Sequence, residues 1–259
     1  MANNIRSAKS ASRWAASDLA AYNIQVVEVH FRDFLGVENL PASRVSRTIL
    51  AYRDYPAVRM SESVNTFFRL LEDVMVQNSR EAAVDNLAAH VLELTGYRRN
   101  DRVIKTREHI RLLVCGMFCD ATPDVCVIDG QSKINLLVQE DKRYRRSTCS
   151  AAEPQLIAEA IAAFQDRNRR LSAAGLPLVN AAVLPGIVMI GSAPFFYKIQ
   201  VTRALAGAVE RGQYPVHTTY VHRMSPPVGN QGNIYNDGML PLENRSIIFS
   251  CYEAFRRFV

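Results

Sequence analysis

Two carboxylates and a lysine stand close together in one stretch of this chain, residues 122–143, which reads TPDVCVIDGQSKINLLVQEDKR. Asp124 follows a proline and precedes a short apolar run, and a second apolar run ends at Glu140-Asp141-Lys142. Carboxylate oxygens are the ligands that Mg²⁺ prefers in proteins. A lysine beside them can stabilise the negative charge that develops on a phosphoryl group. These residue types therefore predict a divalent-metal site suited to phosphodiester hydrolysis.

Each residue of this stretch has an expected role. Asp124 and Glu140 would hold Mg²⁺ or Mn²⁺, and the backbone carbonyl of Asp141 would add a further ligand. Lys142 would stabilise the transition state or orient the attacking water. Lysine is scarce in this chain, with 5 lysines against 26 arginines, so Lys142 stands out from the generic positive charge. The competing interpretation is a surface Glu-Lys pair at a sheet edge, which contributes little to stability.

Strand alternation determines which of these side chains share a face. In a strand, every second residue points to the same side. One face is expected to carry Ile134, Leu136, Val138, Glu140 and Lys142, and the other Asn135, Leu137, Gln139 and Asp141. An apolar face that changes to Glu and Lys at its end predicts a buried strand that emerges in a cleft.

The elements that must position these residues follow from periodicity and from turn residues. A short strand over 125–128, a turn at Asp129-Gly130 and a strand from 134 to about 142 predict a hairpin. Helical periodicity and cap residues predict helices, and alternating or continuous apolar runs predict strands. The expected helices cover 61–78, 79–97, 153–171, 202–211 and 244–258, and the expected further strands cover 23–31, 109–116, 186–191, 195–202 and 216–222, with a loop over 225–241. This order predicts an α/β (α+β) domain with a central mixed sheet flanked by helices.

Composition bounds the class of protein. The chain has 259 residues, a net charge of +6 and a pI of about 9.2, which favours polyanionic partners such as nucleic acid without requiring them. We expect a flexible basic tail over 1–20 and a single domain over 21–259.

Five cysteines with no regular spacing indicate a reduced, intracellular protein. The apolar run 179–196 is broken by prolines and glycines, so buried strands are expected there and no membrane partner.

The motif residues also carry a resemblance. The segment DVCVID…LLVQEDKR followed by EPQLIAEAIAAF resembles the PD-(D/E)XK nuclease superfamily, and in particular nuclease-like proteins of mushroom-forming fungi. The similarity extends from about residue 80 to the C-terminus, with motif character at 122–160. It implies a restriction-endonuclease-like core, Asp124 and Glu140 as metal ligands and Lys142 as the catalytic lysine.

The same resemblance implies two further site residues. Members often carry an acid on a preceding helix, and Glu81 or Asp85 would fill that place as an additional metal ligand. Many also have a polar residue on the following helix, where Gln155 matches as a member of the catalytic set. The competing interpretation places Glu81 and Asp85 on a solvated helix face, one helical turn apart, and Gln155 at a helix start that needs no special role.

Arginines beside the motif suggest where nucleic acid would bind. Arg143, Arg145 and Arg146, with Tyr144 between them, could contact a phosphate backbone, DNA or RNA. Two functions remain open: a metal-dependent nuclease, and a catalytically inactive nuclease-fold module that binds nucleic acid or a protein partner. The oligomeric state does not follow from the sequence.

Overall fold

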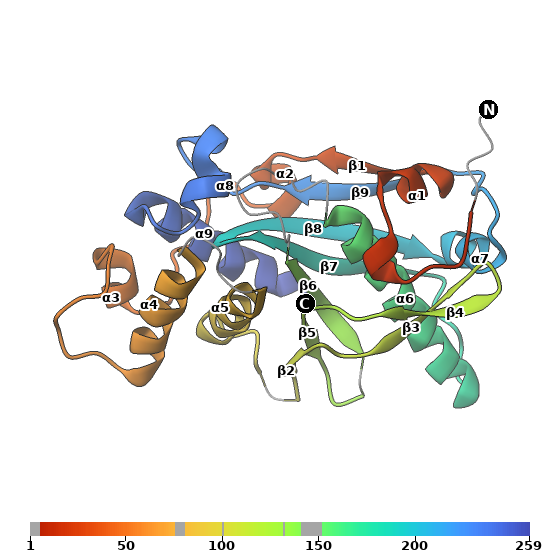
Figure 1. Cartoon of the computed structure of the whole chain (residues 1–259), viewed down its shortest axis with the longest axis horizontal. Helices are drawn as coiled ribbons and strands as arrows, with labels where there is room; N and C mark the ends of the chain where they lie inside the picture. The colour runs from red at the N-terminus through yellow and green to blue at the C-terminus, as the bar shows by residue number, and fades with distance from the viewer. Residues whose placement is uncertain (1–5, 76–80, 100, 132, 141–151) are drawn as a thin grey trace.

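A mixed seven-stranded sheet forms the centre of the molecule, and helices pack on both of its faces (Figure 1). This computed structural model describes residues 6–75, 81–99, 101–131, 133–140 and 152–259. The strand order in the sheet is β1-β9-β8-β7-β6-β5-β2, and a separate two-stranded ribbon pairs β3 with β4. The architecture is mixed α/β and is consistent with a restriction-endonuclease-like fold, as the sequence predicts.

The bounds of the elements are as follows. The strands are β1 (Ile24–Glu28), β2 (Val103–Thr106), β3 (Ile110–Val114), β4 (Met117–Ala121), β5 (Val125–Ile128), β6 (Ile134–Glu140), β7 (Ala181–Ile190), β8 (Ala193–Thr202) and β9 (Thr219–Met224). The helices are α1 (Ala16–Ala21), α2 (Phe31–Leu35), α3 (Arg47–Ala51), α4 (Glu62–Met75), α5 (Glu81–Leu94), α6 (Glu153–Ala173), α7 (Arg203–Arg211), α8 (Ile234–Asp237) and α9 (Leu242–Phe255). Short 3₁₀ turns cover Ala11–Arg13, Gln231–Asn233 and Arg256–Phe258.

The hairpin and the helix that follows it form the part of the sheet on which the motif lies. β5 and β6 are antiparallel, and β6 is parallel to the next strand of the sheet, β7. Parallel neighbours require a crossover connection, and α6 lies in the connection between β6 and β7. Pro154 occupies the first turn of α6, where a missing backbone N–H costs nothing. The hairpin, its crossover helix and β7 therefore form one contiguous unit.

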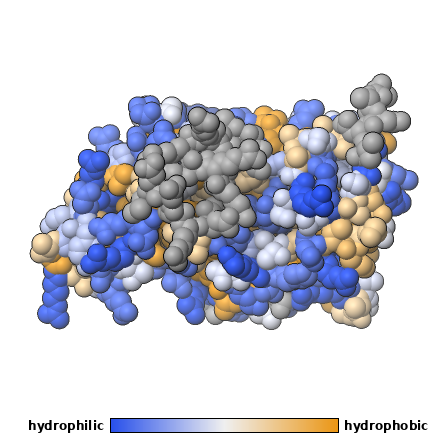
Figure 2. Space-filling view, in the orientation of Figure 1, coloured by the Kyte–Doolittle hydropathy of each residue, from blue (hydrophilic) through white to orange (hydrophobic). Residues whose placement is uncertain are grey.

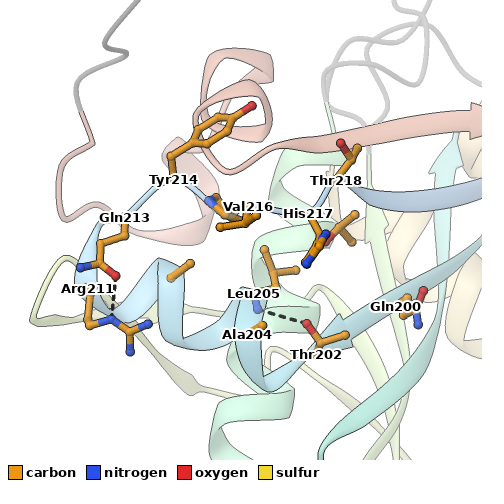
Figure 3. Close-up of a pocket in the computed structure, with 13 residues that line it drawn as sticks. Gln200, Thr202, Ala204, Leu205, Arg211, Gln213, Tyr214, Val216, His217 and Thr218 are labelled. Atoms are coloured by element: carbon orange, nitrogen blue, oxygen red, sulfur yellow. Dashed lines mark hydrogen bonds between the residues drawn. The ribbon is translucent and has the colours of Figure 1, made fainter. Parts of the chain in front are cut away.

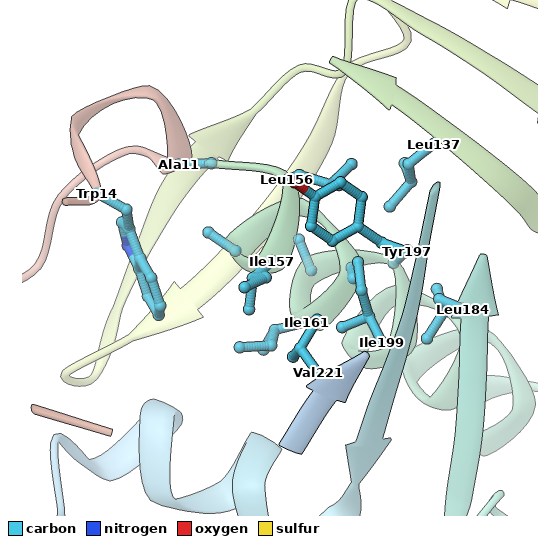
Figure 4. Close-up of a cluster of buried hydrophobic side chains, with 14 of the residues drawn as sticks. Ala11, Trp14, Leu137, Leu156, Ile157, Ile161, Leu184, Tyr197, Ile199 and Val221 are labelled. Carbon is cyan, nitrogen blue, oxygen red and sulfur yellow. The ribbon is translucent and has the colours of Figure 1, made fainter. Parts of the chain in front are cut away.

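Two hydrophobic clusters divide the core between the faces of the sheet. On one face α6 packs with its apolar side on Leu137, Tyr197 and Ile199, which belong to β6 and β8 (Figure 4). On the other face α4, α5 and α9 cover Val138 of β6 and its same-face neighbours. Sheets covered on both faces have strands that are apolar almost throughout, which explains the continuous apolar run of β7. Among the described residues, no helix is long and apolar enough to cross a membrane.

Most of the expected elements are present, but the alternation along β6 is interrupted. Leu136 and Val138 belong to one cluster and Leu137 to the other, as expected. Ile134 packs with the cluster of Leu137 and not with that of Leu136. The pairing of β6 with β5 shifts register between Val127 and Ile128, which is a β-bulge. The extra residue in β6 turns the side chain of Ile134 to the other face of the sheet. The prediction for the face of Ile134 was therefore wrong.

The described part of the expected N-terminal tail packs against the domain. Ala11 and Trp14 are 1% and 5% exposed and belong to the cluster under α6 (Figure 4). The ring of Trp14 stacks on that of Tyr22 with centroids 5.4 Å apart. Residues 6–20 thus differ from the expected flexible segment, because their few apolar side chains find a partner surface that composition does not reveal.

Candidate functional site

Asp124 lies immediately before β5, beside the last residues of β6. Val125 pairs with Val138, so the next residues along the two antiparallel strands are Asp124 and Gln139. The side-chain amide of Gln139 donates a hydrogen bond to Oδ2 of Asp124. Gln139 is 0% exposed, whereas Asp124 is partly accessible. The carboxylate therefore lies at the boundary between a buried polar interior and the surface.

Gln155, in the first turn of α6, extends this network away from the sheet. Its Nε2 donates to Oε1 of Gln139 at 3.0 Å and to Oε1 of Glu159, one helical turn further on, also at 3.0 Å. A continuous chain of hydrogen bonds thus runs from Asp124 through the two glutamines to Glu159. Gln155, nominated by the resemblance, lies within this network; a catalytic role for it stays a prediction.

Glu159 is the most unusual member of the network. It is 0% exposed, and among the described residues no hydrogen-bond partner reaches its Oε2. Burial raises the pKa of Glu159 well above its usual value; the hydrogen bond from Gln155 opposes this, and the negative charge of Asp124 adds to it. Buried polar atoms are normally satisfied, so a carboxyl oxygen left without a partner calls for an explanation.

A second polar network fixes the start of α6. Glu153 is 6% exposed and accepts hydrogen bonds from the Tyr197 hydroxyl at 2.9 Å and from Nη1 of Arg223 at 2.7 Å. Arg223 also forms an ion pair with Glu28 of the edge strand β1. Burial disfavours the charge of Arg223, but its hydrogen bond to Glu28 and the charge of Glu153 raise its pKa overall. Gln155 is only two residues from this anchor, so its position over Gln139 is well determined.

Asp85 reaches the core from the opposite side of the sheet. It is 7% exposed, which contradicts the alternative that placed it on a solvated helix face. Its helix, α5, contributes Leu87 and Val91 to the cluster that covers Val138. Asp85 and Glu159 therefore come from helices on opposite faces, and the end of β6 lies between those faces.

Several predicted site residues fall outside the described part of the chain. These are Asp141, Lys142, Arg143, Arg145 and Arg146, together with the side chains of Glu81 and Glu140. The backbone of Glu140 is described: it is the last residue of β6 and pairs with Met189 of β7. Within the described residues, no group of three or more His, Cys, Asp or Glu side chains is arranged to hold a metal ion. The assignment of metal ligands thus stays a prediction.

Sequence reasoning missed Gln139, Glu159 and Glu153 as members of these networks. Gln139 was placed on the face away from Glu140, and the structure agrees that it packs toward α6. A signal for Glu159 was present in the sequence: QLIAE places two polar residues four apart in the first half of the helix, where the residues between and after them up to Phe164 are apolar. Residues at i and i+4 share one face of a helix, so a buried apolar helix with such a pair indicates an internal polar site.

Compared with models of known protein families and with curated protein sequences, the chain matches none.

Proposed function

We propose that this protein is a divalent-metal-dependent phosphodiesterase that hydrolyses nucleic acid. The observation that supports the proposal is the buried network at the end of β6, in which Asp124 lies near a second carboxyl, Glu159, that has an oxygen without a described partner. A buried carboxyl group with a strongly raised pKa beside another carboxylate is characteristic of functional sites. The network lies at the end of the strand that leads directly into Glu140-Asp141-Lys142.

The donor set fits a hard divalent cation. Asp124 and Glu159 supply carboxylate oxygens, and Mg²⁺ and Mn²⁺ prefer such ligands. A positive charge at this place would offset both the burial of Glu159 and its repulsion by Asp124, which together raise its pKa. Asp124, Glu140, Glu159 and the backbone carbonyl of Asp141 are the proposed ligands, with Asp85 or Glu81 as a further acid. A bound divalent ion would polarise the phosphoryl group and acidify a water molecule.

The residues of the chain have separate tasks in this proposal. Gln139 and Gln155 hold the Asp124 carboxylate in one orientation through two successive hydrogen bonds. Lys142 stabilises the negative charge on the phosphoryl oxygens or orients the attacking water. Arg143, Arg145 and Arg146 contact the phosphate backbone on either side of the scissile bond.

A second candidate is a catalytically inactive module that keeps the fold and binds nucleic acid or a protein. The observation that favours it is the hydrogen bond from Gln139, which already occupies Oδ2 of Asp124. A carboxylate engaged by an internal amide can serve as a structural link and needs no metal. The two candidates differ in whether cleavage depends on a cation.

Cleavage of labelled DNA and RNA, single- and double-stranded, in Mg²⁺ or Mn²⁺ tests the proposal. Glu140→Ala and Lys142→Ala should each lower the cleavage rate by about 10²-fold or more, the usual cost of losing one charge-stabilising group, and EDTA should abolish cleavage.

The chain offers a matched control in Lys105 and Glu108, an ion pair of the same charges at 3.2 Å on the surface. Lys105→Ala and Glu108→Ala should leave the rate within twofold. Cleavage that survives EDTA or persists in both site variants contradicts the proposal. Folded protein that binds nucleic acid but cleaves none of the substrates supports the inactive module.

A further inference from the structure

A basic groove lies at the end of the sheet away from the candidate site, on both sides of α7. Two hollows, of about 340 and 630 Å³, share Arg211 as a lining residue. We name this surface the α7 groove and define it by five side chains, Arg169, Arg203, Arg211, Tyr214 and His217. Figure 3 shows the larger hollow, with Arg211 at the end of α7 and Tyr214 and His217 on the segment that follows.

The groove is well separated from the carboxylates. Thr202, which lines it, pairs with Ala181 at the start of β7, whereas Gln139 of the candidate site pairs with Val188. Seven strand residues separate the two positions, which corresponds to about 20 Å at the usual rise. A ligand of the groove therefore does not occupy the candidate site.

Two of the arginines keep most of their hydrogen-bonding capacity. Among the described residues, Arg203 has a single side-chain contact, a weak one of 3.4 Å to the Asn180 amide, and Arg211 bonds the Gln213 amide at 2.9 Å. Neither forms an ion pair with a described carboxylate, and both are exposed. A guanidinium has five N–H donors in a fork that matches phosphate oxygens. These two side chains are therefore available to an anion.

The floor of the smaller hollow is fixed by hydrogen bonds that are already complete. The Gln165 amide bonds both the N–H and the C=O of Leu113 at 2.9 Å. The Asn168 amide bonds the backbone of Val179 in the same way, at 2.9 and 3.0 Å. Glu210 is the single acid in the lining. The groove thus presents a rigid polar floor with positively charged walls.

Aromatic rings lie beside the arginines at the same end of the molecule. Phe118 of β4 is 48% exposed and lies under the guanidinium groups of Arg111 and Arg169, at 4.3 and 5.5 Å. Tyr214, 51% exposed, lies in the wall of the larger hollow. In Figure 2, hydrophobic side chains gather among hydrophilic ones at this end, over the tip of the β3–β4 ribbon and α7. Arginine interleaved with exposed aromatic rings suits the phosphates and bases of a nucleic acid.

We propose that the α7 groove binds the phosphodiester backbone of a nucleic acid, independently of the metal-dependent site. Arg203 and Arg211 are eight residues apart on α7, about 12 Å along the helix axis. Phosphates repeat every few ångström along a nucleic-acid strand, about 3.4 Å per nucleotide where the bases are stacked, so the two arginines contact phosphates several nucleotides apart. An acidic protein surface offers neither this regular spacing of anionic groups nor bases that can stack on exposed aromatic rings. The proposal does not depend on catalysis.

Binding of a fluorescein-labelled single-stranded 20-mer DNA, followed by anisotropy in EDTA across a salt series, tests the proposal. Arg203→Ala combined with Arg211→Ala should raise Kd about tenfold and reduce the slope of log Kd against log salt by about 1.5, since each lost phosphate contact removes about 0.7–0.9. The matched control is Arg47→Ala with Arg59→Ala, two exposed arginines distant from α7. It removes the same charge and should change Kd less than twofold.

Three results would overturn the proposal. The first is an unchanged Kd and slope in the α7 variant. The second is an equal loss of affinity in the control, which means that net charge alone attracts the DNA. The third is displacement of the 20-mer by poly-glutamate as effectively as by unlabelled DNA at equal charge. Because the measurement is made without divalent cation, a failure of the nuclease proposal leaves its outcome unchanged.

Discussion

At the scale of single residues, the side chains of the candidate site hold one another in place through hydrogen bonds, and the burial of a carboxyl group among them lowers the stability of the fold. Gln139 and Gln155 connect Asp124 to Glu159, and Glu159 is buried with an oxygen that has no described partner. Burying a carboxyl group without full compensation lowers the stability of the folded state. Functional sites commonly contain such unfavourable arrangements, and the cost can be measured.

Replacing Glu159 by Gln should stabilise the metal-free protein at neutral pH. The folded-state pKa of Glu159 lies well above the usual 4.5, so between these values the unfolded chain loses its proton and the folded chain keeps it. Stability contributed by the protonated group is complete below pH 4.5 and is lost as pH rises toward the folded pKa. Glu159→Gln removes this loss and keeps an oxygen that can accept from Gln155. We expect a gain in the free energy of unfolding at pH 8 that vanishes near pH 4.5.

Urea unfolding in EDTA measures this gain, with the fluorescence of the single tryptophan, Trp14, as the probe. Glu72→Gln serves as the control, because the Glu72 side chain is 49% exposed and should show no comparable gain. A Glu159→Gln protein whose stability falls with pH as steeply as that of the wild type contradicts the assignment.

At the scale of elements, the contact between α6 and the sheet determines where Gln155 lies. Gly186 of β7 has no Cβ, and a Cβ built there would lie 3.0 and 3.2 Å from the two methyl carbons of Leu156 and 3.3 Å from Ile199. Leu156 is the residue after Gln155. The close approach of α6 and β7 at Gly186 therefore determines how far Gln155 lies from the sheet.

Gly186→Ala should destabilise the protein by about 1–3 kcal/mol, the usual cost of overpacking a core. Leu156→Val shortens the side chain at the point of contact, so the double variant should be more stable than the sum of the two single changes predicts. Gly229→Ala, where a Cβ meets nothing within 4 Å, is the control and should have a small effect. If the effects of Gly186→Ala and Leu156→Val on the free energy of unfolding are strictly additive, Leu156 of α6 does not pack against Gly186.

Local pattern predicted the elements better than it predicted the contacts between them. The hairpin, α6 and the turn after α5 follow from alternation, from Pro154 and from Gly96, whose φ is +73°. β2 and β4 were missed because each is short and partly exposed, so its apolar alternation is weak. Asp124 was singled out by its place in the motif and Gln155 by the family resemblance, and both belong to the hydrogen-bond network. Glu159 was missed because its burial depends on the sheet that α6 crosses.

The same limit applies to Arg245 of α9. It is 0% exposed and donates to backbone carbonyl groups, among them those of Ile49, Tyr52 and Met239. Burial lowers the pKa of Arg245 to about 10. Its sequence neighbours give no sign of this role, because the carbonyl groups of Ile49 and Tyr52 lie nearly 200 residues away in the chain. Contacts of that kind follow from the tertiary fold and not from residue type.

At the scale of the whole molecule, the candidate metal site and the α7 groove lie at different ends of the same sheet. A nucleic acid held at α7 would need to span about 20 Å along the strands to reach Asp124. Binding and metal dependence are therefore separable properties. This separation makes a global measurement informative, because a cation that binds at the carboxylates should stabilise the whole fold without involving α7.

Mn²⁺ should stabilise the wild-type protein against unfolding by RT ln(1 + [Mn²⁺]/Kd), about 2.7 kcal/mol at a concentration one hundred times Kd. Asp124→Asn should lose most of this stabilisation, because it removes a charged ligand. Asp120→Asn is the control: that side chain is 76% exposed on the β3–β4 ribbon and should leave the effect intact. The Arg203→Ala and Arg211→Ala variant should also respond like the wild type.

The effect of Mn²⁺ should also increase with pH. Ligand carboxyl groups must be ionised to bind a cation, and the pKa of Glu159 is raised in the metal-free protein. Thermal unfolding at pH 6 and pH 8 measures the difference. Equal stabilisation of the wild type and of Asp124→Asn would place the cation elsewhere on the molecule. No stabilisation of either protein at pH 8 would leave the inactive nuclease-fold module as the better description, since the buried carboxyl groups would then serve packing and hydrogen bonding alone.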